Sequence, residues 1–205
     1  SEIEKFKAEE YWTIDVDLFN NQKALIPSHL IQLDGKKLEK FDLNTEEKAL
    51  KAKAKIEAQE FYISNIERKK TNRYPAPPFT TSTLQQEAAR KLGFSVSQTM
   101  VIAQRLYENG QITYMRTDSV NLSDLALATS RQTITELMGE QYVKTRQFAT
   151  KTKGAQEAHE AIRPTYMSNE KISGSAQEQK LYELIWKRTI ASQMADAELE
   201  KTTAT

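Results

Sequence analysis

Cysteine is absent from the sequence, which excludes disulfide bonds and thiolate metal sites. Histidine occurs only twice and glycine six times in 205 residues, and we find neither a metal-ligand motif nor a glycine-rich phosphate loop. No apolar run is long enough to span a bilayer, and no signal-peptide pattern opens the sequence. We therefore expect a soluble, cytoplasmic protein that does not bind a membrane.

An excess of one charge is also missing. The 29 lysine and arginine residues are balanced by 28 aspartate and glutamate residues, for a net charge of +1. Bulk charge therefore does not indicate a nucleic-acid-binding protein, and any phosphate-binding surface must be assembled by folding. Hydrophobic residues make up 39% of the chain, enough for a packed core in one large domain or two modest ones.

Strand and helix signals alternate in the first third of the sequence. Apolar residues occupy every second position from Trp12 to Leu18, the pattern of a half-buried strand. Asp34-Gly35 is a tight-turn dipeptide, and Asn44 and Glu47 have the spacing of a capping box. We predict strands over residues 12–18, 24–33 (broken at Pro27) and 61–68, and a helix over residues 45–60.

The remainder of the sequence is predicted to be mostly helical. Residues 68–78 combine basic side chains with a proline-rich run and are predicted to form a linker, because proline neither continues a helix nor fits a central strand. Serine caps and terminal glycines then indicate helices over residues 82–92, 95–108, 123–139 and 156–163, and from Ser175 onward. The predicted fold class is α+β, predominantly helical.

Two of the predicted helices are joined by Gly93-Phe94-Ser95 and followed by a short extended piece. This order resembles a helix-turn-helix unit with a wing-like strand behind it. Short helices joined at a glycine are also common in proteins that never bind DNA, so both interpretations stay open.

Residues 111–119 carry the most specific pattern in the chain. Tyr114, Arg116 and Asp118 alternate, so an extended segment would place them on one face. A free tyrosine has a pKa of about 10 and is a poor nucleophile, but a nearby guanidinium would stabilise both the phenolate and a phosphorane-like transition state. Attack on a phosphodiester would leave a phosphotyrosine link, which can be resealed without a nucleotide cofactor. The alternative is a surface strand on which Tyr114 packs and Arg116 pairs with Asp118.

A second group of candidate residues lies further along the chain. His159 and Arg163 are four residues apart and would share one face of a short helix. An imidazole paired with Asp118 would be held protonated and would grip a phosphate; the alternative is a histidine that contacts backbone at a helix end. Asp15 and Asp17 have a spacing that can also bind Mg²⁺, but a solvent-facing strand edge explains them better.

Several motifs, in a fixed order, resemble the bacterial type IA DNA topoisomerases. The active-site signature of that family is similar to residues 112–119, and the other matching segments are residues 78–86, 92–94, 103–108, 157–164 and 181–186. The resemblance is strong from about residue 74 to residue 194. It is weaker over residues 1–73, where mainly Glu10-Tyr11-Trp12 and the strand–helix–strand order agree.

The resemblance implies an enzyme that cuts one DNA strand, passes the other through the gap and reseals the cut, relaxing negatively supercoiled DNA in the nucleoid. Tyr114 would attack a 5′-phosphate of single-stranded DNA and Arg116 would position that phosphate. The supporting residues would be His159 with Asp118, and also Arg163 and Thr113. Mg²⁺ would be the cofactor, with its ligands outside this chain, and no nucleotide would be needed.

The resemblance also implies missing parts. Members of the family carry a TOPRIM domain, with an acidic Mg²⁺ site, and a base domain, and we expect this chain to be a central fragment that is inactive alone. It would comprise part of the arch domain (residues 1–74), the domain bearing the tyrosine (75–196) and the start of a returning arch strand (197–205). A non-catalytic helix-turn-helix DNA-binding module is the alternative, and a helical interaction domain without a nucleic-acid role is a third hypothesis.

Overall fold

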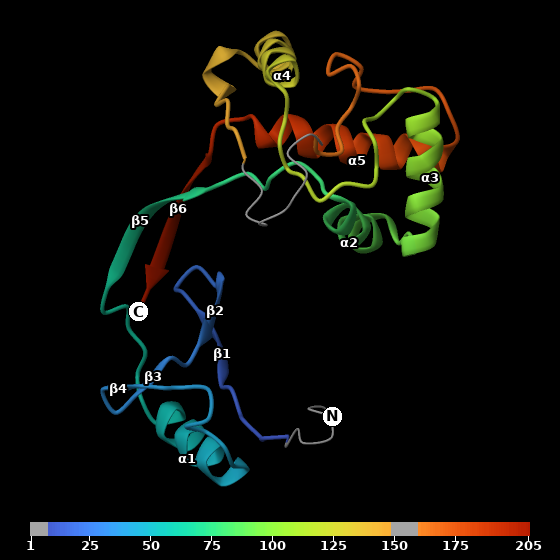
Figure 1. Ribbon diagram of the computed structural model, residues 1–205. Helices are drawn as coiled ribbons and strands as arrows, with labels where there is room; N and C mark the ends of the chain where they lie inside the picture. The colour runs from blue at the N-terminus through green and yellow to red at the C-terminus, as the bar shows by residue number, and fades with distance from the viewer. Residues whose placement is uncertain (1–7, 149–159) are drawn as a thin grey trace. The chain divides into compact units, whose positions relative to one another are not determined.

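The computed structural model describes residues 8–148 and 160–205 (Figure 1). The chain divides into two compact units, one holding Ser1–Ile66 with Ala204–Thr205 and the other Glu67–Thr203. The described residues form five α-helices and six short strands, which confirms the predicted α+β class. No helix in the described ranges is long and apolar enough to cross a membrane.

Two small hairpins and one helix make up the first unit. β1 (Asp15–Phe19) pairs antiparallel with β2 (Leu25–His29), and β3 (Gln32–Leu33) pairs with β4 (Lys36–Lys37). Asp34 and Gly35 have φ values of 52° and 76°, so the predicted tight turn is confirmed as one with two positive φ angles. The predicted break at Pro27 is wrong, because a sheet of two strands has only edges and an edge strand tolerates proline.

The helix of the first unit is α1 (Glu46–Glu57), shorter at its C-terminal end than predicted. Its N-cap is Thr45, whose hydroxyl accepts from the backbone N–H of Lys48; the predicted cap, Asn44, instead binds the Lys48 ammonium at 2.8 Å. Either residue type satisfies a free N–H at a helix start, so the sequence alone did not choose between neighbours.

Two paired strands of eight residues each include the two places where the chain leaves one unit and enters the other. β5 (Ile66–Arg73) pairs with β6 (Ala197–Ala204), and the Thr205 N–H donates to the Asn65 carbonyl at 2.9 Å. The predicted strand over residues 61–68 and linker over residues 68–78 were therefore misplaced. β5 is exposed throughout, so it shows no hydrophobic alternation, and its partner strand is distant in the sequence.

Four helices form the second unit: α2 (Thr81–Leu92), α3 (Val96–Glu108), α4 (Asp124–Leu137) and α5 (Ala176–Ser192). Three of the predicted serine caps, at Ser95, Ser123 and Ser175, are confirmed. Gly93 ends α2 with φ 70°, a left-handed conformation that favours glycine. The cap of α2 was predicted two residues late, at Ser82, whereas Thr80 is the N-cap and forms a capping box with Thr83.

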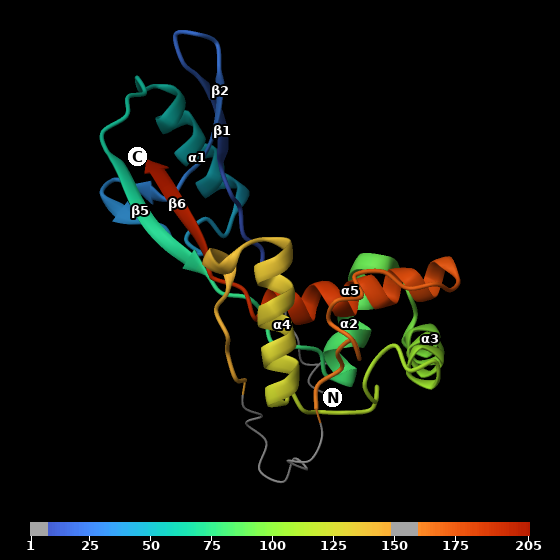
Figure 2. The ribbon, with the colours of Figure 1, turned by 90° about the horizontal axis from the view of Figure 1, so that it is seen from above.

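α5 runs through the second unit, with α4 and α2 on opposite sides of it and α3 beside its first turns (Figures 1 and 2). Its buried aromatic side chains bind the preceding loop: the Trp186 indole donates to the Met167 carbonyl at 2.8 Å and the Tyr182 hydroxyl to the Asn169 carbonyl at 2.6 Å. Burial raises the pKa of Tyr182 to about 12. The core of this unit therefore rests on one central helix, which supports the segments that carry the candidate site.

The prediction of a helix over residues 156–163 is wrong for the described residues of that range. Residues 156–159 lie outside the described residues, and residues 160–163 are not helical. Ile162 forms an antiparallel bridge with Phe79, and Pro164 forms one with Ile112. The segment is extended because it lies between two backbone partners that are distant in sequence, and these contacts override its local helical pattern.

Candidate active site around Tyr114

The Tyr114 segment connects α3 to α4 without forming a strand. Its only bridge in the described structure joins Ile112 to Pro164, so the wing-like strand predicted behind the two helices is not formed. The side chains nevertheless alternate as predicted: Met115 and Ser119 are buried, whereas Tyr114, Arg116 and Asp118 are exposed. The three candidate groups therefore face solvent, on a segment whose alternate residues anchor it to the core.

The Tyr114 ring is held by a second tyrosine. Tyr107, in the last turn of α3, packs its ring edge-to-face against Tyr114, with 5.2 Å between centroids and 65° between planes. Both rings are partly exposed, Tyr114 at 42% and Tyr107 at 40%. Within residues 8–148 and 160–205 the Tyr114 hydroxyl has no hydrogen-bond partner, so the contact with Tyr107 supports the ring without engaging its oxygen. The sequence assigned no role to Tyr107.

Arg116 and Asp118 are exposed and do not pair with each other. In the part of the chain that the structure describes, no carboxylate forms an ion pair with Arg116 and no cation forms one with Asp118. The alternative of a solvated Arg116–Asp118 pair is therefore absent from the described contacts. His159 lies outside the described residues, and its pairing with Asp118 stays a prediction.

Thr113 fixes the chain immediately before Tyr114. Its hydroxyl donates to the Ala161 carbonyl at 2.7 Å and accepts from the Arg163 N–H at 2.9 Å, and its own N–H donates to the Arg163 carbonyl at 2.9 Å. Because the hydroxyl is both donor and acceptor, it holds the two chain segments together where no strand ladder does. The structure thus brings Thr113, Arg163 and the start of the Tyr114 segment together.

The Arg163 side chain is largely buried and points at protein groups. Its guanidinium donates to Glu160 Oε2 at 2.7 and 3.2 Å and to the Pro164 carbonyl at 2.9 Å. Glu160 also accepts from the backbone N–H of Ser123, the N-cap of α4, at 2.7 Å. Burial acts to raise the pKa of Glu160, but the hydrogen bonds from Arg163 and Ser123 outweigh it, and the pKa is lowered. Arg163 therefore links its own segment to the start of α4.

The lowered pKa of Glu160 makes part of the stability depend on pH. A carboxyl whose pKa is lower in the folded state stabilises the protein fully above its unfolded pKa, near 4.5, and loses that contribution as pH falls through the folded pKa. We expect Glu160→Gln to reduce the free energy of unfolding by about 1–3 kcal/mol at pH 7. The difference between variant and wild type should shrink below pH 4.5. Urea unfolding at pH 7 and pH 3.5 measures this, and an equal loss at both values would contradict it.

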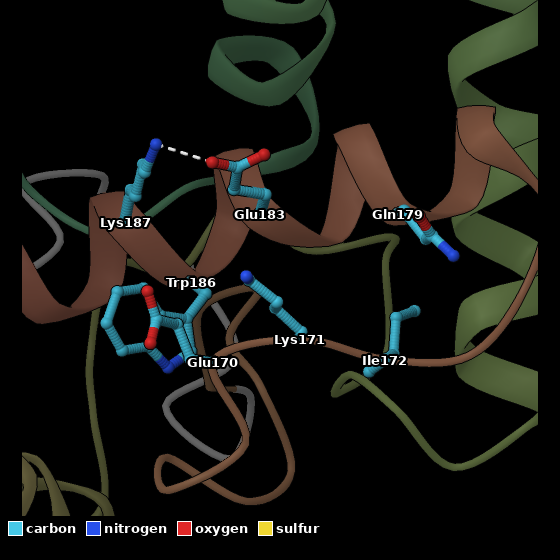
Figure 3. Close-up of a pocket in the computed structure, with 7 residues that line it drawn as sticks. All are labelled: Glu170, Lys171, Ile172, Gln179, Glu183, Trp186 and Lys187. Carbon is cyan, nitrogen blue, oxygen red and sulfur yellow. Dashed lines mark hydrogen bonds and ion pairs between the residues drawn. The ribbon is translucent and has the colours of Figure 1, made fainter.

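A hollow beside α5 does not include the Tyr114 segment. This hollow lies between α5 and residues 170–172, and its lining residues are drawn in Figure 3. Its volume is about 480 Å³, and two of the lining residues, Glu183 and Lys187, pair at 2.5 Å. None of the predicted site residues lines it. Asp15 contacts His29, and no group of three or more histidine, aspartate or glutamate side chains in the described ranges is arranged to hold a metal ion. Among the described residues, a Mg²⁺ site would therefore have fewer than three such ligands.

Comparison with known proteins gives consistent matches over the whole chain. The sequence profile of the DNA topoisomerase family matches residues 1–205. The chain is 53% identical over 204 residues to DNA topoisomerase 1 of Zymomonas mobilis, covering 98% of this chain and 17% of that protein. It is 46% identical over 218 residues to DNA topoisomerase 1 of Rickettsia bellii, covering 100% of this chain and 27% of that protein.

A solved structure is also similar. The full-length topoisomerase I from Thermotoga maritima superposes with a TM-score of 0.70 at 38% sequence identity, over 99% of this chain and 32% of that one. The chain thus spans less than a third of the length of each of these relatives.

Proposed function

Because this chain belongs to the bacterial type IA DNA topoisomerase family, we propose that it supplies the nucleophile with which such an enzyme cuts one DNA strand. The Tyr114 oxygen bonds to the phosphorus of a phosphodiester in single-stranded DNA, the phenolic proton leaves, and the bond from phosphorus to the 3′-oxygen breaks. The 3′-oxygen takes up a proton, and the 5′-phosphate stays on the protein. The observation that carries the proposal is an exposed Tyr114 followed two residues later by an exposed Arg116 that, among the described residues, has no ion-pair partner.

Arg116 has the chemistry to hold the phosphate during this step. A guanidinium donates two parallel hydrogen bonds to phosphate oxygens, and it stabilises the extra negative charge of the transition state. An arginine already committed to an internal carboxylate would have to break that pair first. Because no described carboxylate pairs with Arg116, its fork is available to a ligand.

The remaining predicted residues support this step in the proposal. Asp118 would pair with His159, which would support DNA binding and cleavage. Thr113 and Arg163 keep the backbone next to Tyr114 in place through their contacts with Ala161 and Glu160.

Resealing reverses the attack. The 3′-hydroxyl displaces the tyrosine from phosphorus, so the phosphodiester is restored without a nucleotide cofactor. Cutting one strand, passing the other through the gap and resealing relaxes negatively supercoiled DNA. The proposed substrates are therefore single-stranded DNA and negatively supercoiled duplex DNA.

The proposal assigns the chain to the middle of a longer enzyme. Residues 1–74 are part of an arch domain, residues 75–196 form the domain bearing the tyrosine, and residues 197–205 begin the return of the chain into the arch. The TOPRIM and base domains, and the ligands of Mg²⁺, lie in other parts of that enzyme. We propose that residues 1–205 alone do not relax supercoiled DNA.

The test is to identify the residue that becomes attached to DNA. The full-length protein is incubated with a single-stranded oligonucleotide, denatured and digested, and the nucleotide-bearing peptide is sequenced by mass spectrometry. We expect the adduct on Tyr114 through a 5′-phosphate, and we expect plasmid relaxation with Mg²⁺ by the full-length protein but not by residues 1–205. An adduct on Tyr107, or relaxation by the isolated chain, would contradict the respective part of the proposal.

The second candidate function is a non-catalytic DNA-binding module built on α2, the turn at Gly93 and α3. It predicts binding of DNA without any covalent adduct. The same experiment therefore separates the two functions.

A further inference from the structure

The hydroxyl of Thr81 binds both peptide groups that flank Arg116. It donates to the Met115 carbonyl at 2.8 Å, with the Thr117 carbonyl 3.1 Å away, and it accepts from the Thr117 N–H at 2.9 Å. The Thr81 backbone N–H donates to the Thr117 carbonyl at 2.9 Å as well. The peptide units on either side of Arg116 are therefore held by a single residue.

This residue is itself rigidly placed. Thr81 is the first residue of α2, directly after the N-cap Thr80, so its N–H is one of the donors that a helix start leaves free. The Thr117 carbonyl satisfies that donor. α2 is anchored in the core through Leu84 and Ala88, both fully buried. The start of α2 thus fixes the backbone of Arg116 relative to the core.

Two anchors alternate with the two exposed side chains. Thr113 is bound to residues 161–163 before Tyr114, and Thr81 binds the peptide groups around Arg116, while the Met115 side chain between them is buried. The segment has no strand ladder, so the hydrogen bonds of these two hydroxyls fix the backbone positions from which the Tyr114 and Arg116 side chains extend.

We infer that Thr81 is a positioning residue for Arg116, which it holds in register with Tyr114 for phosphate binding and strand cleavage. The inference rests on the function proposed above. Thr81 does not touch DNA in this scheme. It acts by fixing the backbone from which the guanidinium extends, and a displacement of about 1 Å at such a group can slow a reaction on the order of 100-fold.

If Thr81 only stabilised the fold, removing a buried threonine hydroxyl elsewhere in the same unit would slow cleavage equally. Thr189 is a fully buried threonine on α5 whose hydroxyl donates to the Ile185 carbonyl at 3.0 Å. Its replacement by valine removes a side-chain hydrogen bond within the same unit, far along the sequence from the Tyr114 segment, whereas Thr81→Val removes the bonds to Met115 and Thr117. Thr189→Val is therefore the matched control for a general loss of stability.

The experiment measures single-turnover cleavage of a labelled single-stranded oligonucleotide by the full-length protein, at saturating DNA. We expect Thr81→Val to lower the cleavage rate constant about 10- to 100-fold while the Kd for the oligonucleotide changes less than about threefold. Thr81→Ser, which keeps the hydroxyl, should recover most of the rate. Thr189→Val should cleave at the wild-type rate. Thr81→Ala provides the same test if the valine variant does not fold.

A double-mutant cycle checks that Thr81 acts through Arg116. In an Arg116→Lys background, Thr81→Val should cost less than about threefold, because two residues that act through one group are not additive and a flexible ammonium depends less on backbone placement. Wild-type cleavage by Thr81→Val, or equal slowing by Thr81→Val and Thr189→Val, would overturn the inference. If Tyr114→Phe still forms the adduct, the proposed function itself fails, and this outcome is distinct from the other two.

Discussion

Replacing Tyr114 with phenylalanine is expected to lower formation of the covalent DNA–protein adduct by more than about 10³-fold in the full-length protein. The substitution removes only the oxygen that would bond to phosphorus. The ring keeps its contact with Tyr107, 5.2 Å away, and the backbone keeps its bonds through Thr113. The Kd for single-stranded DNA should therefore change little, and the loss should appear in the chemical step. Denaturing gel electrophoresis of a labelled oligonucleotide measures the adduct directly.

Tyr107→Phe is the matched control for this experiment. Tyr107 is exposed to nearly the same extent as Tyr114, and the two rings contact each other. Its edge-to-face contact depends on the ring and not on the hydroxyl, so the variant should form the adduct at close to the wild-type level. If Tyr107→Phe abolished the adduct and Tyr114→Phe did not, the nucleophile would be assigned to the wrong ring.

Replacing Phe79 with alanine is expected to reduce the free energy of unfolding of the second unit by about 3–5 kcal/mol. The Phe79 ring is fully buried, so its removal leaves a cavity in the core. The Arg188 guanidinium lies 4.2 Å from the ring centroid, and it also pairs with Glu87 at 3.3 Å. The variant therefore loses a cation–π contact, worth about 0.5–2 kcal/mol, within the same total.

Urea unfolding followed by the fluorescence of Trp186 measures this loss. Trp186 is buried in the second unit, and in residues 1–205 a Trp12→Phe background leaves it as the sole tryptophan. Leu125→Ala, on the exposed side of α4, is the control and should change stability by less than about 0.5 kcal/mol. A loss below about 1 kcal/mol for Phe79→Ala would show that the core closes around the missing ring.

The helix boundaries of the second unit could be predicted from the sequence because their signals are local. A serine before a helix accepts from a free backbone N–H three residues later. Gly93 ends α2 by adopting a left-handed conformation directly after the last helical residue. The same short range explains the errors of one or two positions. Thr80 and Ser82, or Asn44 and Thr45, are equivalent cap candidates until the packing of the helix selects one.

The extended segments could not be predicted in the same way, because their partners are far away in the sequence. β5 pairs with β6 across more than a hundred residues, and both strands are exposed, so neither shows a hydrophobic period. Residues 160–163 have a helical pattern, yet Ile162 bridges Phe79, and this pairing keeps them extended. Hydrogen bonds between segments distant in the sequence determine that these residues are extended, and local residue propensity does not predict such pairing.

At the candidate site, the sequence by itself determined the chemistry: a phenol at Tyr114, a guanidinium at Arg116 and a carboxylate at Asp118, on alternate residues that all prove exposed. Only the tertiary structure decided how these groups are held. It showed that Tyr107 supports the ring and that the Thr81 hydroxyl binds the peptide groups around Arg116. The physical reason is that residue type and spacing are properties of the chain, whereas a threonine bound to a backbone group 34 residues away exists only after folding has brought the two together.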